Sequence, residues 1–230
     1  MLMADEIIRY SESGEQESIA ETNIVEQLNI MLRDLEECFR ELLFMVKDLD
    51  EGRAVAVDKR YMRVRSIKDN IENTSVNLMD YVIKVSPILT FKDIYLYLIQ
   101  DIVRAAEHAE AAAYRNLLLN TKEFERLPDK LYAELDETVR KIIDMVSKVR
   151  TMLEKIRADQ KYIRELYIEL LKVENAVDEY YRESGLEIIK HYSKDVGALI
   201  LLKELFDKLE DSADIMKRVG TYIRFISIHR

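Results

Sequence analysis

The sequence of 230 residues is 48% hydrophobic and 34% charged, with five glycines and two prolines, a composition typical of long amphipathic helices. Its formal net charge of −9 and the lack of a dense basic run argue against nucleic-acid binding, which requires a patch that neutralises phosphates. A single cysteine, Cys38, excludes an intrachain disulfide and a cysteine-rich zinc site.

Membrane insertion and secretion are also not expected. The longest apolar run, residues 198–202, is too short to span a bilayer. The first residues are acidic and lack the basic-then-apolar order of a signal peptide. The sequence therefore predicts a cytoplasmic protein that does not itself enter the membrane.

Apolar residues recur at alternating three- and four-residue steps along most of the chain, which predicts long helices with one buried face. No long segment alternates with period two, so the predicted fold class is all-α. Residues 1–20 are polar and are expected to form a flexible tail. Six helices are predicted, over residues 22–50, 55–85, 91–120, 128–157, 159–181 and 194–229. The fifth continues to Ile189 unless Gly185 interrupts it.

The six predicted helices form two similar sets of three. Residues 91–94 (FKDI) open the third helix as residues 193–196 (SKDV) open the sixth, and Asp69 and Asp178 occupy similar places in the second and fifth. We therefore expect two pseudo-repeated, antiparallel three-helix bundles, one from residues 21–124 and one from residues 125–230.

The last two predicted helices carry carboxylates beside the core stripe. The four-spaced pairs and their neighbours are Glu174 with Asp178, Glu210 with Asp214, and Asp207 with Asp211. Like charges at this spacing repel each other, so the acidic flank requires a nearby cation. On antiparallel helices the pairs converge, and oxygen ligands suit magnesium, manganese, iron or calcium. The alternative is a solvated flank balanced by neighbouring lysines.

These segments resemble the PhoU-like proteins, and more narrowly the branch that accompanies Pit-type phosphate permeases. The resemblance is carried by residues 173–182 (VENAVDEYYR) and 201–214 (LLKELFDKLEDSAD) and covers residues 22–228. It implies two three-helix bundles with Glu-x-x-x-Asp motifs, which hold iron or zinc clusters in some members. We therefore expect iron, zinc, manganese or magnesium at Glu174, Asp178, Glu210 and Asp214, with Asp207 and Asp211 close by. Lys217 and Arg218 stand where relatives carry a further acid, which favours a mononuclear or weak site.

The first half departs from the family motif. Arg65 and Asp69 stand where Glu-x-x-x-Asp is expected, and Asp101 and Arg104 stand in place of an acidic run. An arginine neutralises a carboxylate through two hydrogen bonds. The hypothesis is a metal-free, degenerate site formed by these four residues.

The resemblance implies a non-catalytic regulatory or accessory protein of inorganic phosphate transport. Its expected partner is a Pit-type permease, reached at the inner face of the membrane, and homodimers are expected. One alternative is a metal-free helical scaffold or adaptor. Another is an enzyme with a carboxylate-bridged metal, which the absence of a Glu-x-x-His motif argues against.

Overall fold

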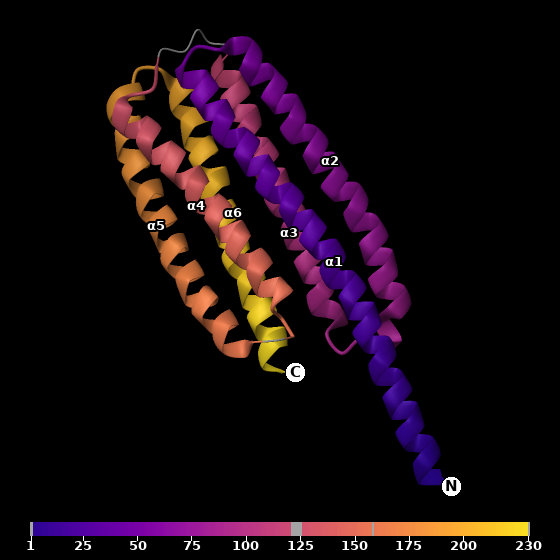
Figure 1. The fold of residues 1–230 in the computed structure, drawn as a ribbon. Helices are drawn as coiled ribbons and strands as arrows, with labels where there is room; N and C mark the ends of the chain where they lie inside the picture. The colour runs from indigo at the N-terminus through magenta and orange to yellow at the C-terminus, as the bar shows by residue number, and fades with distance from the viewer. Residues whose placement is uncertain (1, 121–125, 158, 230) are drawn as a thin grey trace.

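A computed structural model describes residues 2–120, 126–157 and 159–229, and within these ranges the chain forms six long helices and no strand (Figure 1). The helices are α1 (Leu2–Asp50), α2 (Ala54–Val85), α3 (Lys92–Asn120), α4 (Asp129–Glu154), α5 (Gln160–Tyr192) and α6 (Val196–Ile228), with a 3₁₀ turn at Ser86–Ile88. None of the helices in these ranges has a stretch that is both long and apolar enough to traverse a bilayer. The predicted all-α fold class is confirmed.

Two helices are longer than predicted. The helix α1 begins at Leu2 and projects beyond the bundle, where a flexible tail was expected for residues 1–20 (Figure 1). Residues 2–20 contain no proline, and adding residues to an existing helix costs little compared with nucleating one. The helix α5 continues through Gly185 to Tyr192. Glycine inside a helix lowers stability by about 1 kcal/mol, whereas burial of an isoleucine such as Ile188 raises it by about 1.5–3 kcal/mol. Packing beyond Gly185 therefore outweighs the cost of the glycine.

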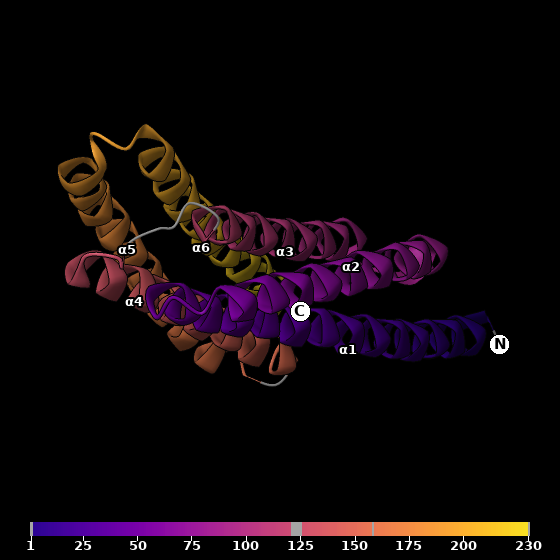
Figure 2. The ribbon, with the colours of Figure 1, turned by 90° about the horizontal axis from the view of Figure 1, so that it is seen from above.

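The helices form two up-and-down, three-helix sets that lie side by side (Figures 1 and 2). Within each set every helix contacts the other two, α1 with α2 and α3, and α4 with α5 and α6. The sets are joined by α1 against α4 and by α3 against α6, which leaves α2 and α5 on opposite outer sides. The predicted pair of antiparallel three-helix bundles is confirmed. The expected boundary between residues 124 and 125 lies outside the described residues.

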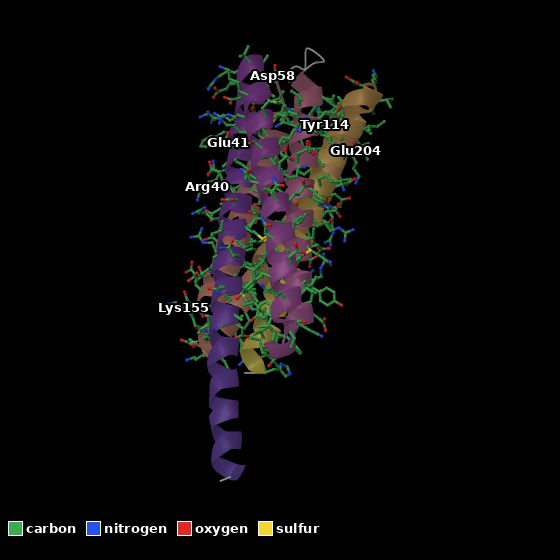
Figure 3. All side chains as sticks on the ribbon, turned by 90° about the vertical axis from the view of Figure 1, so that its right-hand side faces the viewer. Arg40, Glu41, Asp58, Tyr114, Lys155 and Glu204 are labelled. Atoms are coloured by element: carbon green, nitrogen blue, oxygen red, sulfur yellow. The ribbon has the colours of Figure 1, made fainter. Side chains whose placement is uncertain are left out.

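One hydrophobic core runs through both sets, and α3 contributes to it along its whole length. The buried face of α3 is rich in alanine, with Ala105, Ala106, Ala109, Ala112 and Ala113 inaccessible to solvent. Small side chains allow helix axes to approach closely, which explains how α3 contacts α1, α2 and α6 together. Near the upper end of this contact, Arg115 Nε lies 3.1 Å from Glu204 Oε2 of α6, close to the labelled Tyr114 and Glu204 in Figure 3.

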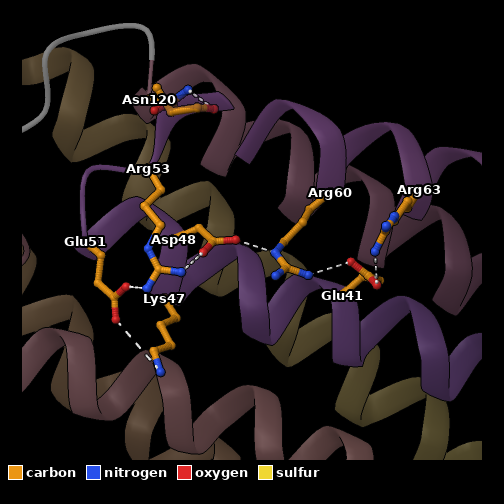
Figure 4. A network of polar contacts seen from close by, with 9 residues as sticks. Glu41, Lys47, Asp48, Glu51, Arg53, Arg60, Arg63 and Asn120 are labelled. Atoms are coloured by element: carbon orange, nitrogen blue, oxygen red, sulfur yellow. Dashed lines mark hydrogen bonds and ion pairs between the residues drawn. The ribbon is translucent and has the colours of Figure 1, made fainter. Parts of the chain in front are cut away.

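The turn between α1 and α2 is held by a network of ion pairs (Figure 4). Arg60 of α2 donates to Asp48 through Nε, and its Nη1 lies 3.0 Å from Glu41 Oε2. Asp48 and Glu41, both on α1, are only 2% and 7% exposed. Arg53 also pairs with Asp48 at 3.1 Å, and Arg63 pairs with Glu41 at 3.2 Å. Two buried carboxylates on α1 are thus neutralised by arginines that follow the turn.

Replacing Gly185 with alanine is expected to raise the free energy of unfolding by about 0.5–1 kcal/mol, because glycine loses more backbone entropy in a helix than alanine. A Cβ atom at this position meets no atom within 4 Å. Gly220→Ala is the control, since a Cβ there overlaps Leu170 Cδ2 and is expected to lower stability by about 1–2 kcal/mol. Urea unfolding measures both, and a destabilised Gly185→Ala variant would contradict the account of α5.

Candidate acidic site between α5 and α6

The acidic residues singled out in the sequence lie on the face where α5 and α6 pack together. The two helices are antiparallel, so Glu174 of α5 lies beside Lys217 of α6 and Tyr181 lies beside Asp207. The hydroxyl of Tyr181 donates to Asp207 Oδ1 at 2.8 Å. The two Glu-x-x-x-Asp pairs therefore face the same interhelical surface.

Lys217 joins one carboxylate from each pair. Its ammonium group donates to Glu174 Oε1 and, at 3.1 Å, to Asp214 Oδ1. Glu174 is only 5% exposed, and a buried carboxylate is costly without a charged partner. The hydrogen bond to Glu174, followed by that to Asp214, raises the pKa of Lys217. Lys217 therefore supplies positive charge between these two acids.

The outer carboxylates have cationic neighbours as well. Lys203 donates to Asp207, and Lys208 Nζ lies 2.8 Å from Asp211 Oδ2. His108 of α3 lies 3.4 Å from Asp211, while burial and the charge of Lys208 lower the pKa of this imidazole. Arg182 lies 3.5 Å from Asp178 on the same helix. Ion pairs thus occur along the whole length of the acidic flank.

Glu210 lies among the other acids of this face. Burial raises the pKa of its carboxyl group, and the charges of Asp214, Asp178, Asp211 and Asp207 raise it further. The effect of Asp178 crosses from α5 to α6, so the two acidic motifs are close enough to interact. Protonation of Glu210 therefore relieves repulsion among the acids of this face.

Glu210→Gln is expected to stabilise the protein by about 0.5 kcal/mol at about pH 8, because the substitution removes repulsion from neighbouring carboxylates. The pKa of Glu210 is raised in the folded state. The ionised group therefore opposes folding above that pKa, and the cost disappears as the pH falls below the usual glutamate range. Urea unfolding between about pH 8 and pH 4.5 should show the variant's advantage shrinking toward acid. Asp214→Asn, which removes a negative charge that pairs with Lys217, should give no such gain; equal behaviour of the two variants would contradict this assignment.

The four residues of the hypothetical first-half site do not form one group. Asp101 of α3 is 8% exposed and binds a guanidinium through both oxygens, but this guanidinium belongs to Arg218 of α6. The two distances are 2.6 Å to Nε and 2.8 Å to Nη2, and these hydrogen bonds raise the pKa of Arg218. Arg104 is exposed, and within the described residues no carboxylate lies within ion-pair distance of it. The neutralising arginine therefore comes from the other half of the molecule.

The remaining pair of that hypothesis lies on α2 at the surface. The side chain of Asp69 is 51% exposed and lies 2.7 Å from Lys68 Nζ. The hydrogen bond from Lys68 lowers the pKa of Asp69, with a smaller contribution from the charge of Arg65. Arg65 is exposed as well. Asp69 and Arg65 thus behave as solvated surface residues of α2.

The acidic face does not fit a metal ion in its present arrangement. In the part of the chain that the structure describes, no group of three or more His, Cys, Asp or Glu side chains has the placement to hold one. Lys217 stands between Glu174 and Asp214, and an ammonium group and a metal cation cannot share the same carboxylate oxygens without strong repulsion. Metal ligation by the six predicted acids remains a prediction.

Comparisons with known proteins identify the fold. No protein-family model matches the sequence, and no curated protein matches it. The structure is similar to PhoU from Pseudomonas aeruginosa, with a TM-score of 0.76 and 14% identity over 93% of this chain and 99% of that one. It is also similar to a PhoU-like phosphate regulatory protein from Shewanella oneidensis MR-1 (TM-score 0.72, 13% identity, 90% and 100% covered). A third similar structure is the phosphate transport system regulatory protein PhoU from Streptococcus pneumoniae (0.66, 9%, 93% and 98%). The chain therefore has the PhoU fold along nearly its whole length.

Proposed function

We propose that this protein is a non-catalytic regulator of inorganic phosphate transport. The observation that carries the proposal is the likeness to PhoU over 93% of this chain and 99% of that one. The likeness includes both bundles and their arrangement, so the whole regulatory scaffold is available. Structures described as phosphate regulatory proteins recur among the similar folds.

The proposed partner is a Pit-type phosphate permease. This choice is supported by residues 173–182 and 201–214, which resemble the branch that accompanies such permeases. The protein would act at the cytoplasmic face and reach the membrane through this partner. The long charged outer helices α2 and α5 offer surfaces for docking and for a homodimer.

The test is phosphate uptake by proteoliposomes that contain a Pit-type permease, with and without the purified protein on the cytoplasmic side. The expected result is a change in uptake rate that saturates with protein concentration. An ATP-driven phosphate permease serves as the control for the choice of partner. If only the ATP-driven permease responded, that permease and not the Pit type would be the partner. If neither responded, the regulatory proposal would be overturned. Light scattering after size-exclusion chromatography measures the oligomeric state in parallel.

The placement of Lys217 supports the metal-free form of this function. A lysine on α6 occupies the position between Glu174 and Asp214 that a bound cation would take. An internal cation offsets the charges of Glu174 and Asp214 at the α5–α6 contact without depending on metal supply. Such a regulator would respond to its partner and not to iron or manganese.

Lys217→Gln is expected to lower the free energy of unfolding by about 1–2 kcal/mol, because Glu174 is left buried without its charged partner. Adding millimolar Mn²⁺ should then raise the melting temperature of the variant but not that of the unmodified protein. Lys203→Gln, on the same helix but paired with Asp207, is the control and should show no metal response. Elemental analysis of protein purified without chelators completes the test. About one equivalent of metal in the unmodified protein, lost in Asp178→Ala with Asp214→Ala, would favour the metal-binding form.

A further inference from the structure

A pocket with basic walls lies at the end of the second bundle, away from the acidic face. It has a volume of about 380 Å³ and lies between the start of α5 and the end of α6. Three of the six residues that line it are cationic, and the others are two polar residues and one apolar residue: Lys161, Arg164, Arg224, Gln160, Ser227 and Ile228. No acidic residue is among them. This composition is unusual in a chain with a net charge of −9.

The three cations differ from most basic residues of the molecule in their pairing. Many lysines and arginines elsewhere in the described chain lie against carboxylates, as Lys217, Arg218 and Arg60 do. Within the described part of the chain, no carboxylate oxygen is placed within ion-pair distance of Lys161, Arg164 or Arg224. Like charges that line one hollow raise its positive potential and attract counter-ions.

Arg224 is held in place by an aromatic contact, but its Nε–H group has no hydrogen-bond acceptor in the described part of the chain. Its guanidinium lies over the ring of Tyr167, with the central carbon 5.0 Å from the ring centroid, and the Tyr167 hydroxyl bonds Thr221 Oγ1 at 3.0 Å. The Nε atom of Arg224 is buried and has no hydrogen-bond partner among the described residues. A buried N–H without an acceptor costs about 1–3 kcal/mol. The contact with Tyr167 therefore holds the guanidinium at the wall of the pocket, where no carboxylate of the described residues offsets its charge.

Three acceptors near this end of the bundle are engaged by other donors. The carboxylate of Asp159, next to Gln160, accepts the backbone N–H of Tyr162 at 2.9 Å and caps α5. In the last turn of α6, the carbonyl of Arg224 accepts the Ser227 hydroxyl at 2.8 Å, and that of Phe225 accepts the His229 N–H at 3.3 Å. The positive end of the α5 dipole lies at Gln160 and Lys161, where anions are favoured.

We propose that this pocket binds a small phosphate-bearing anion. Arginine suits phosphate because its planar guanidinium donates two parallel hydrogen bonds to two oxygens, and Lys161 and Arg164 add charge. A volume of about 380 Å³ falls within the range of small-molecule sites and exceeds the size of orthophosphate. A short polyphosphate or a nucleotide phosphate fits this space, with Ile228 available to contact an apolar portion. The proposal does not depend on the regulatory role, because binding is measured on the purified protein and uptake in proteoliposomes.

The test is isothermal titration calorimetry of the full chain with tripolyphosphate at fixed, moderate salt concentration. The expected result is saturable binding at one site per chain. Arg224→Gln and the double variant Lys161→Gln, Arg164→Gln should each lower the affinity at least about tenfold, as expected for loss of charge-assisted hydrogen bonds. Lys172→Gln, an exposed cation farther along α5, is the matched control and should bind as the unmodified protein does. Circular dichroism melts establish that each variant is folded.

Two further titrations identify the source of the phosphate group. Binding of ATP more tightly than tripolyphosphate would assign a nucleotide, and the reverse order would assign a polyphosphate; both support the site. Equal weakening by Arg224→Gln and Lys172→Gln would indicate non-specific attraction and overturn it. No saturable binding of either ligand at millimolar concentration would overturn it as well.

Discussion

Replacing Arg218 with alanine is expected to lower the free energy of unfolding by about 2–3 kcal/mol, because it leaves Asp101 charged and buried without a partner. Asp101 is 8% exposed, and both of its carboxylate oxygens accept hydrogen bonds from Arg218, at 2.6 and 2.8 Å. This loss is smaller than the roughly 3–5 kcal/mol typical of breaking a fully buried pair, since the Arg218 side chain is 41% exposed. The pair joins α3 to α6, so its loss weakens the contact between the two halves.

Urea unfolding at neutral pH measures this effect, and a double-mutant cycle isolates the pair. Asp101→Asn keeps the side-chain volume and removes the charge that Arg218 neutralises. The double variant Arg218→Ala, Asp101→Asn should therefore be more stable than Arg218→Ala alone. A change of less than about 0.5 kcal/mol for Arg218→Ala would show that the pair behaves as an ordinary surface ion pair.

Arg60→Ala is expected to have a larger effect, a loss of about 3–4 kcal/mol, because one arginine contacts two buried carboxylates. Asp48 and Glu41 are 2% and 7% exposed, and Arg60 bridges them across the α1–α2 contact. Arg53 and Arg63 remain, one on each carboxylate, which limits the loss. The melting temperature should fall by a large margin without a change in helical content of the folded state.

Arg60→Lys is the matched variant. A lysine keeps the charge but has no planar fork to reach two separated acids, so an intermediate loss of about 1–2 kcal/mol is expected. Arg63→Ala, with a side chain that is 66% exposed, should cost less than about 1 kcal/mol. If Arg60→Ala and Arg63→Ala destabilised the protein equally, the central role given to Arg60 would be wrong.

The helices were predictable because each has a core-facing stripe several turns long. Gly52 and Pro87 mark ends that the structure places at Asp50 and Val85. The first turns of α1 were missed because polar composition was read as a sign of a flexible tail. The continuation of α5 through Gly185 was left open, since a glycine's cost must be weighed against packing that a sequence does not display.

The candidate site was predictable only as far as spacing along one helix. Asp207 and Asp211 have lysines three or four residues away, a pattern visible in the sequence. Lys217 follows Asp214 by three residues, but its contact with Glu174 depends on the register between α5 and α6. The pairing of Asp101 with Arg218 spans 117 residues and depends on how the two halves pack. Arg104 is only three residues from Asp101 on the same helix, but the guanidinium that binds Asp101 is that of Arg218.

The alanine face of α3 also limits how this molecule can transmit a signal. Domain closure requires an interface whose side chains can adopt a second packing, and alanine has no rotamers to exchange. Five alanines of α3 lie buried in the shared core, and the two bundles are expected to move as one body. The regulator proposed above would then act through occupancy. Its output would be the fraction of partner molecules that carry it, set by concentration and affinity rather than by an internal change of shape.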